Sequence, residues 1–123
     1  MPYKLVVSDT LEYAVKFTLR DGSKDREFGF KATSQRVDIP AFRDSLANST
    51  RPLVNELRDY IQGPLAKMQM VDWIGDAALQ DEAGKPAPAG AEALATLLLN
   101  EGLTQHVFNV MADANSAKGK LGN

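Results

Sequence analysis

The sequence predicts an α+β domain, in which an N-terminal antiparallel β-hairpin, with room for a third strand, is followed by four or five short α-helices. Three observations predict this fold. Apolar and polar residues alternate over residues 13–33, apolar residues recur at helical spacing after Asp38, and 123 residues suffice to bury a single core. We therefore expect one domain over residues 1–114. Residues 115–123 are small and polar, and we expect them to form a flexible tail.

The hairpin is predicted by two alternating segments that flank a turn. Residues 13–19 and residues 28–33 place aromatic and β-branched side chains on one face and mostly charged or small ones on the other. This pattern is typical of half-buried strands. Between them, Gly22 follows Asp21 and can adopt the positive φ that a tight hairpin turn requires. An additional edge strand is suggested by three alternating apolar residues near the N-terminus, Tyr3, Leu5 and Val7.

The first two helices are predicted by capping residues and an apolar stripe. Asp38 can cap a helix with Pro40 in its first turn, where the missing N–H of proline costs no hydrogen bond. Apolar residues within residues 53–61 follow the spacing of one helix face. Gly63-Pro64 ends that helix, because the residue before a proline avoids helical geometry. For residues 65–74 the pattern is ambiguous, and we favour a short helix that ends near Asp72.

The last two helices are predicted by leucine-rich and aromatic segments. A loop over residues 83–90 precedes a helix that begins near Ala91 and ends at Gly102, since glycine favours helix C-termini. A final helix begins at Leu103 or Thr104 and carries a broad apolar surface.

Composition and charge argue against several function classes. The formal net charge of -2 gives the chain no overall attraction to the phosphates of nucleic acid. The absence of cysteine excludes disulfides, thiolate catalysis and cysteine-ligated metals. The single histidine, His106, lies among apolar residues, and no spacing singles out a pair of catalytic carboxylates. We therefore predict a non-catalytic protein with no cofactor and no metal site. No apolar segment approaches the roughly 20 residues of a membrane helix, so we expect an intracellular protein without a membrane partner.

A basic side of the hairpin raises the alternative of a small single-stranded nucleic-acid-binding protein. Such proteins combine a cationic groove with aromatic side chains on which bases stack. Strand alternation, however, places Phe28 and Phe30 on the face opposite Lys31, so we expect both rings to pack into the core. The basic residues concerned are Arg20, Lys24, Arg26, Lys31 and Arg36.

The apolar content of the last two helices predicts a binding surface for another polypeptide. Their apolar side chains cover more than one stripe, and leaving such a side chain in water forfeits roughly 1.5–3 kcal/mol. Either the hairpin covers all of them, or an apolar helix or a second copy of the chain covers part of them. The candidate partner-binding residues are Leu94, Leu97, Leu98, Val107, Phe108 and Met111.

The order of these segments resembles one protein family. Residues 15–33 resemble the opening hairpin of the small tail assembly chaperones of long-tailed phages and prophages. The amphipathic helix at residues 53–61 follows, and then Trp73 and the acidic turn Asp81-Glu82-Ala83-Gly84-Lys85-Pro86. A leucine helix over residues 94–102 and a last helix with an aromatic residue complete the order.

The likeness covers roughly residues 11–114, with two departures. The family usually has a shorter, acidic connection where this chain has Gln62-Gly63-Pro64-Leu65. It also often has a tyrosine in the last helix, where Phe108 or Met111 stands here.

The resemblance implies a function in phage tail morphogenesis. Such proteins are thought to bind the long helical tape-measure protein in the host cytoplasm and to keep it soluble until tube subunits assemble around it. They are not expected in the mature virion. The resemblance also admits the tail tube protein and further copies of the chain as partners. It further admits a longer form of the chain, made by ribosomal frameshifting. Another phage structural component, such as a tail terminator or a head–tail connector, is the alternative within phage biology.

Overall fold

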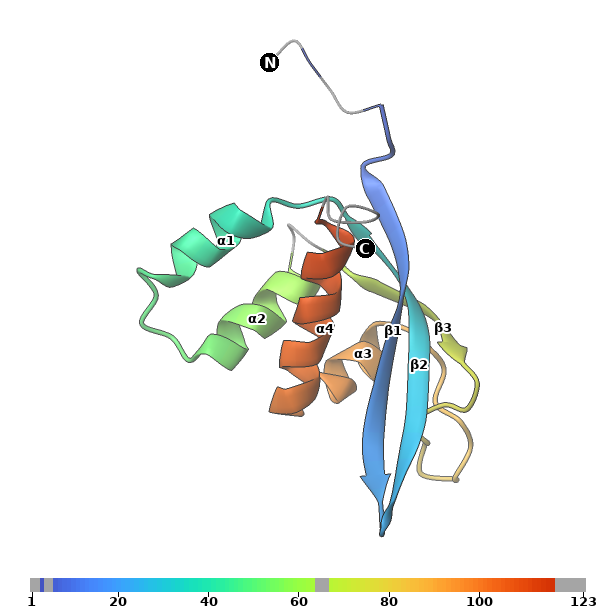
Figure 1. Ribbon diagram of the computed structural model, residues 1–123. Helices are drawn as coiled ribbons and strands as arrows, with labels where there is room; N and C mark the ends of the chain where they lie inside the picture. Colours follow the sequence, from blue (N-terminus) through green and yellow to red (C-terminus); the bar gives the residue numbers. More distant parts are fainter. Residues whose placement is uncertain (1–2, 4–5, 64–66, 117–123) are drawn as a thin grey trace.

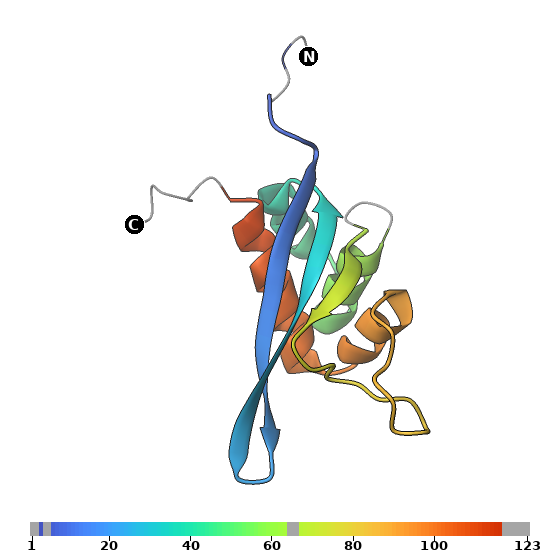
Figure 2. The ribbon, with the colours of Figure 1, turned by 90° about the vertical axis from the view of Figure 1, so that its right-hand side faces the viewer.

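A computed structural model describes residues 3, 6–63 and 67–116. Within them the chain forms a three-stranded sheet and four helices, which confirms the predicted α+β class. The helices lie on one face of the sheet and leave the other face open (Figures 1 and 2). In chain order the elements are β1 (Thr10–Asp21), β2 (Lys24–Gln35), α1 (Ile39–Leu46), α2 (Leu53–Gln62), β3 (Gln69–Ile74), α3 (Ala91–Leu97) and α4 (Glu101–Ala114).

The predicted hairpin is confirmed and is longer than the alternation suggested. β1 and β2 pair antiparallel in unbroken register from Thr10 opposite Gln35 to Asp21 opposite Lys24. The two-residue turn begins at Gly22, whose φ is 64°, so glycine suits this position because it has no side chain to clash. The hairpin tip extends beyond the helices (Figure 1). Its inner face supplies four buried side chains to the core, those of Val15, Phe17, Phe30 and Ala32.

The third strand is β3, and the expected helix ending near Asp72 is wrong. β3 pairs antiparallel with β2, and its partners place Met70 opposite Ala32 and Trp73 opposite Phe30. A bulge between Lys31 and Ala32 shifts the register there, which explains why β3 lacks a clean alternation. Residues 64–66 of the expected helix lie outside the described residues.

The suggested N-terminal edge strand is also wrong where the structure describes it. Tyr3 and Val7 belong to no strand, and both are exposed. Leu5, the third residue of that pattern, lies outside the described residues. The sheet order is β1-β2-β3, so β1 has β2 on one side and is an edge strand of this sheet.

The starts of α1 and α4 follow local capping chemistry. The Asp38 carboxylate accepts the Ala41 N–H at 3.0 Å, as the predicted cap of α1 requires. α2 ends at Gln62, next to Gly63, as predicted. Gly102, in contrast, does not end a helix: α3 stops at Leu97, and Gly102 lies in the first turn of α4. α4 begins earlier than predicted because the Asn100 side chain caps it, accepting the Leu103 N–H at 3.1 Å.

The end of α4 is fastened to the rest of the domain. The Asn115 side-chain carbonyl accepts the Val37 N–H at 2.8 Å, and its amide donates to the Met111 carbonyl at 2.9 Å. Asn115, which we had assigned to the flexible tail, is therefore fixed to the segment that leads from β2 to α1. Residues 117–123 of the expected tail lie outside the described residues.

Candidate functional site

The six candidate partner-binding residues lie in the core of the monomer. Each has at most 4% of its surface exposed, so the expectation of an uncovered groove is wrong. A partner could not contact these side chains without displacing part of the fold. They are Leu94 and Leu97 of α3, Leu98 just after it, and Val107, Phe108 and Met111 of α4.

Side chains of β3 and α2 cover these two helices in addition to those of the hairpin. β3 adds the buried Met70 and the half-buried Trp73 to the inner face of the sheet. α2 adds Leu57 and Ile61, both nearly inaccessible to solvent. Residues 69–72 form a strand where the sequence predicts a helix, so the sheet covers more apolar area than a two-stranded hairpin would.

Large apolar side chains are exposed elsewhere on the surface. Leu53 at the start of α2 is 52% exposed, and Leu99 between α3 and α4 is 72% exposed. Leu53 borders a shallow groove between the starts of α2 and α4, which Leu57 and Gln105 also line. Single exposed apolar residues are ordinary on protein surfaces and define no site by themselves. The others are Tyr3, Val6 and Val7 before β1 and Val71 in β3.

Three aromatic rings join α1 to α2 and α4. Phe42 of α1 stacks on Tyr60 of α2, with ring centroids 3.8 Å apart and planes 18° apart. The Phe42 ring also lies 5.5 Å from that of Phe108 in α4. The Arg43 guanidinium lies 5.9 Å from the centroid of the Phe108 ring, within the range of a cation–π contact. Phe108 is thus the one predicted binding residue that these contacts place directly beneath α1.

The chemistry of Tyr60 reflects this enclosure. Burial raises the pKa of the Tyr60 hydroxyl, and the negative charge of Asp38 raises it further. The sequence alone does not pair Phe42 with Tyr60, because no local pattern specifies which helices meet in space.

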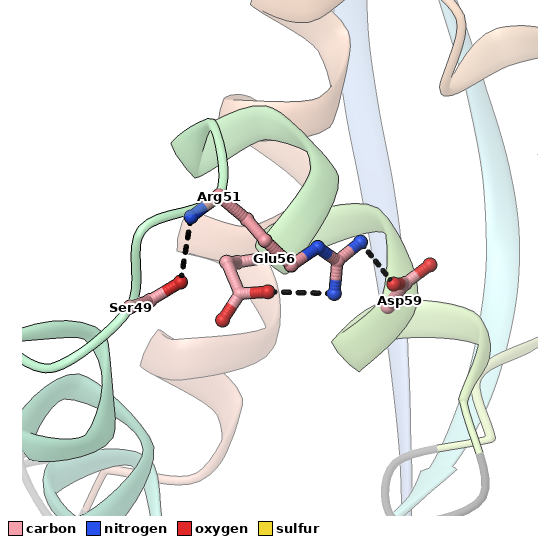
Figure 3. Close-up of polar contacts among 4 residues, drawn as sticks. All are labelled: Ser49, Arg51, Glu56 and Asp59. Carbon is pink, nitrogen blue, oxygen red and sulfur yellow. Dashed lines mark hydrogen bonds and ion pairs between the residues drawn. The ribbon is translucent and has the colours of Figure 1, made fainter.

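An arginine fastens the segment between α1 and α2. The Arg51 guanidinium contacts the Glu56 carboxylate at 2.7 Å and the Asp59 carboxylate at 2.6 Å, and both acidic residues belong to α2 (Figure 3). The Arg51 N–H donates to the Ser49 hydroxyl at 3.1 Å. These ion pairs raise the pKa of the guanidinium, which stays protonated in any case. Arg51 therefore holds the end of the α1–α2 connection against α2.

The tryptophan and the acidic turn form one structural unit. The Trp73 indole N–H donates to the Ala87 carbonyl at 2.7 Å. The Asp81 carboxylate accepts the backbone N–H groups of Ala83 and Lys85, both at 2.9 Å, as Asx turns do. The acidic residue at the start of this turn thus has a structural role, and the turn leads the chain from β3 to α3.

Two arginines on the basic side of the hairpin are paired with acidic residues. Arg20 pairs with Asp25 at 3.2 Å, and Arg26 pairs with Asp21 at 3.1 Å. Phe30 is fully buried, as predicted, and Phe28 is half-buried beneath the Arg26 guanidinium. A nucleic-acid site would need free cations beside accessible aromatic faces, whereas Arg20 and Arg26 are paired with carboxylates and the Phe30 ring is buried.

His106 links α4 to the sheet edge. Its ring Nε2 lies 2.5 Å from the Lys16 carbonyl of β1, so the side chain makes a hydrogen bond between the two elements. Over residues 3, 6–63 and 67–116, no group of three or more His, Asp or Glu side chains could hold a metal ion. Across the same ranges, no helix has both the length and the apolar character needed to cross a membrane.

Comparison of the chain with protein-family models, curated proteins and solved structures found no match.

Proposed function

We propose that the chain is a tail assembly chaperone that binds the tape-measure protein of a long-tailed phage or prophage. The observation that supports the proposal best is the order of its segments. A hairpin with an Asp-Gly turn precedes an amphipathic helix, Trp73, an acidic Gly-Lys-Pro turn, a leucine helix and a final helix with Phe108.

The contacts of the monomer join several of the segments that carry the resemblance. Trp73 bonds to the residue that follows the acidic turn, and the turn leads into the leucine helix α3. Segments that lie apart in the sequence are thereby joined in one structure.

The mechanism that we propose is reversible masking of apolar helix surface. A tape-measure helix exposes apolar residues along its length, and many copies of a small domain could cover them in the host cytoplasm. Each contact must be weak enough for the growing tube to displace it. The proposal therefore requires a modest affinity for each copy, and it requires that the chain leave before the virion is complete.

Co-expression with the tape-measure protein of the same phage or prophage tests the proposal. We expect the tape-measure protein to move from the insoluble to the soluble fraction and to co-purify with the chain. A chain with Lys24→Ala at the exposed hairpin tip serves as a matched control and should act like the unaltered chain. Continued aggregation of the tape-measure protein, with the chain folded and in excess, would refute the proposal.

Mass spectrometry of purified particles separates the chaperone from the alternative of a structural component. A tail terminator or head–tail connector stays in the virion, whereas a chaperone does not. Detection of the chain at a fixed stoichiometry in mature particles would favour that alternative.

A further inference from the structure

We propose that α1 covers a docking surface on α2 and α4, and that this surface accepts an amphipathic helix of a partner in place of α1. The surface consists of the rings of Tyr60 and Phe108, on which Phe42 now lies. That the natural partner is a tape-measure helix rests on the proposed function. The surface itself is argued from the contacts of this chain alone.

α1 is the least enclosed of the four helices. Of its eight residues, all of which the structure describes, Ile39 is buried, whereas α2, α3 and α4 each bury at least three side chains. Phe42 and Leu46 are half-buried, and the rest of the helix is exposed. Releasing α1 therefore exposes fewer buried side chains of the released helix than releasing any other helix, and we infer that opening α1 is the least costly local opening among them.

The segments on both sides of α1 are fastened independently of it. Before α1, the Val37 N–H is bonded to Asn115 at the end of α4. After α1, Arg51 is paired with Glu56 and Asp59 of α2 (Figure 3). The movement is thus confined to the thirteen residues between Val37 and Arg51, and the direct contacts of α2 with α4 do not depend on it.

The side chains of α1 specify the chemistry of a partner helix that could replace it. Ile39, Phe42 and Leu46 are spaced i, i+3 and i+7, so they share one helix face, and Arg43 follows at i+4. The partner helix should therefore carry apolar residues at i and i+7, an aromatic residue at i+3 and a basic residue at i+4. The aromatic residue replaces the ring stacked on Tyr60, and the cation replaces Arg43 beside the electron-rich face of Phe108.

A peptide of α1 supplied in trans tests the proposal. The probe is a synthetic peptide of residues 37–48 with blocked termini, titrated into the isotope-labelled chain and followed by NMR. In the unaltered chain the tethered α1 competes with the peptide at a high effective concentration. The Phe42→Ala variant weakens this competitor, so we expect it to bind the peptide at least tenfold more tightly. The shifted resonances should surround Tyr60 and Phe108.

Two controls define the specificity of the binding. Asp44→Ala changes an exposed residue of α1 and should leave the affinity at that of the unaltered chain. A peptide with alanine in place of Phe42 should not bind any of the chains. Equal affinity of the peptide for the unaltered chain and Phe42→Ala, or shifts located elsewhere on the domain, would overturn the proposal.

A second variant keeps the test decisive if Phe42→Ala fails to fold. Asp38→Ala removes the cap of α1 and leaves all three rings in place. We expect it to bind the peptide at least threefold more tightly than the unaltered chain, and equal binding would again overturn the proposal. Because no tape-measure protein is used, a chain that binds the peptide but fails in co-expression would refute the proposed function and retain the docking surface.

Discussion

α4 and α1 are both amphipathic helices that direct a phenylalanine toward the same aromatic cluster, but they differ in how far the domain encloses them. α4 buries six of its fourteen residues between α2 and the sheet. α1 buries Ile39 and is otherwise held mainly by contacts of Phe42 with Tyr60 and Phe108 and of Arg43 with Phe108. The difference shows that apolar content alone does not identify a binding helix. The more apolar helix belongs to the core, and the less apolar one covers a surface that can be uncovered.

The largest effect is expected from a truncation in α4. Met111 is fully buried, so Met111→Ala should lower the free energy of unfolding by about 2–5 kcal/mol. Leu99→Ala is the matched control, because that side chain is mostly exposed and should change stability by less than about 0.5 kcal/mol. Urea unfolding followed by circular dichroism measures both values. Similar losses in the two variants would contradict the assignment of α4 to the core.

A smaller effect is expected from the corresponding truncation in α1. Phe42 is half-buried, so Phe42→Ala should cost about 1–2 kcal/mol from lost burial and ring contacts. Amide exchange should rise mainly in α1, while α2 and α4 keep their protection in native conditions. If Phe42→Ala lowered the protection of all helices equally, α1 would be part of the same cooperative core as α4.

The start of α4 offers a polar counterpart to these apolar truncations. The Thr104 hydroxyl is fully buried and donates to the Leu98 carbonyl at 2.6 Å. Thr104→Val keeps the shape and removes the donor, and it should destabilise the chain by about 1 kcal/mol. Thr96→Val removes an exposed hydroxyl of α3 and should have a smaller effect in the same urea titration. The reverse order would show that the junction of α3 and α4 is not held by this bond.

The smallest effect concerns the ionisation of Tyr60 beneath α1. The folded-state pKa of Tyr60 is raised above the ordinary value of 10.0, mainly by burial. The folded chain therefore holds this proton more tightly than the unfolded chain does. The contribution of the neutral Tyr60 side chain to stability is complete below pH 10 and is lost as the pH rises through the folded-state pKa.

Absorbance titration near 295 nm, with Tyr60→Phe used to assign the step, measures this ionisation. Uncovering the ring with Phe42→Ala should move the pKa of Tyr60 down toward its ordinary value. An unchanged pKa in that variant would mean that α1 does not determine the environment of Tyr60.

Local sequence patterns predicted most elements of this fold because their causes are local. The alternation of residues 13–19 and 28–33, the Gly22 turn and the Asp38 cap each act within a few residues. β3 was missed because its place is set by pairing with β2, far away in the sequence, and a bulge disrupts its pattern. The α3–α4 boundary was misplaced because the Asn100 cap outweighs the tendency of Gly102 to end a helix.

The candidate site was harder to predict for a related reason. Helix patterns correctly identified the apolar faces of α3 and α4, but burial depends on what lies opposite each face. Leu94 and Met111 are covered within the monomer, so their apolar character reflects the core. The contact of Phe42 with Tyr60 joins two helices through a connection that no periodicity describes.

Native-state hydrogen exchange of the unaltered chain tests most directly whether α1 is a separable cover on a folded core. Exchange of the backbone amides is measured at low, increasing urea concentrations. We predict that the α1 amides exchange through a local opening, with a free energy below that of global unfolding and little dependence on urea, while the amides of α2 and α4 exchange only with global unfolding. Exchange of α1 with the same free energy and the same urea dependence as α4 would contradict the account.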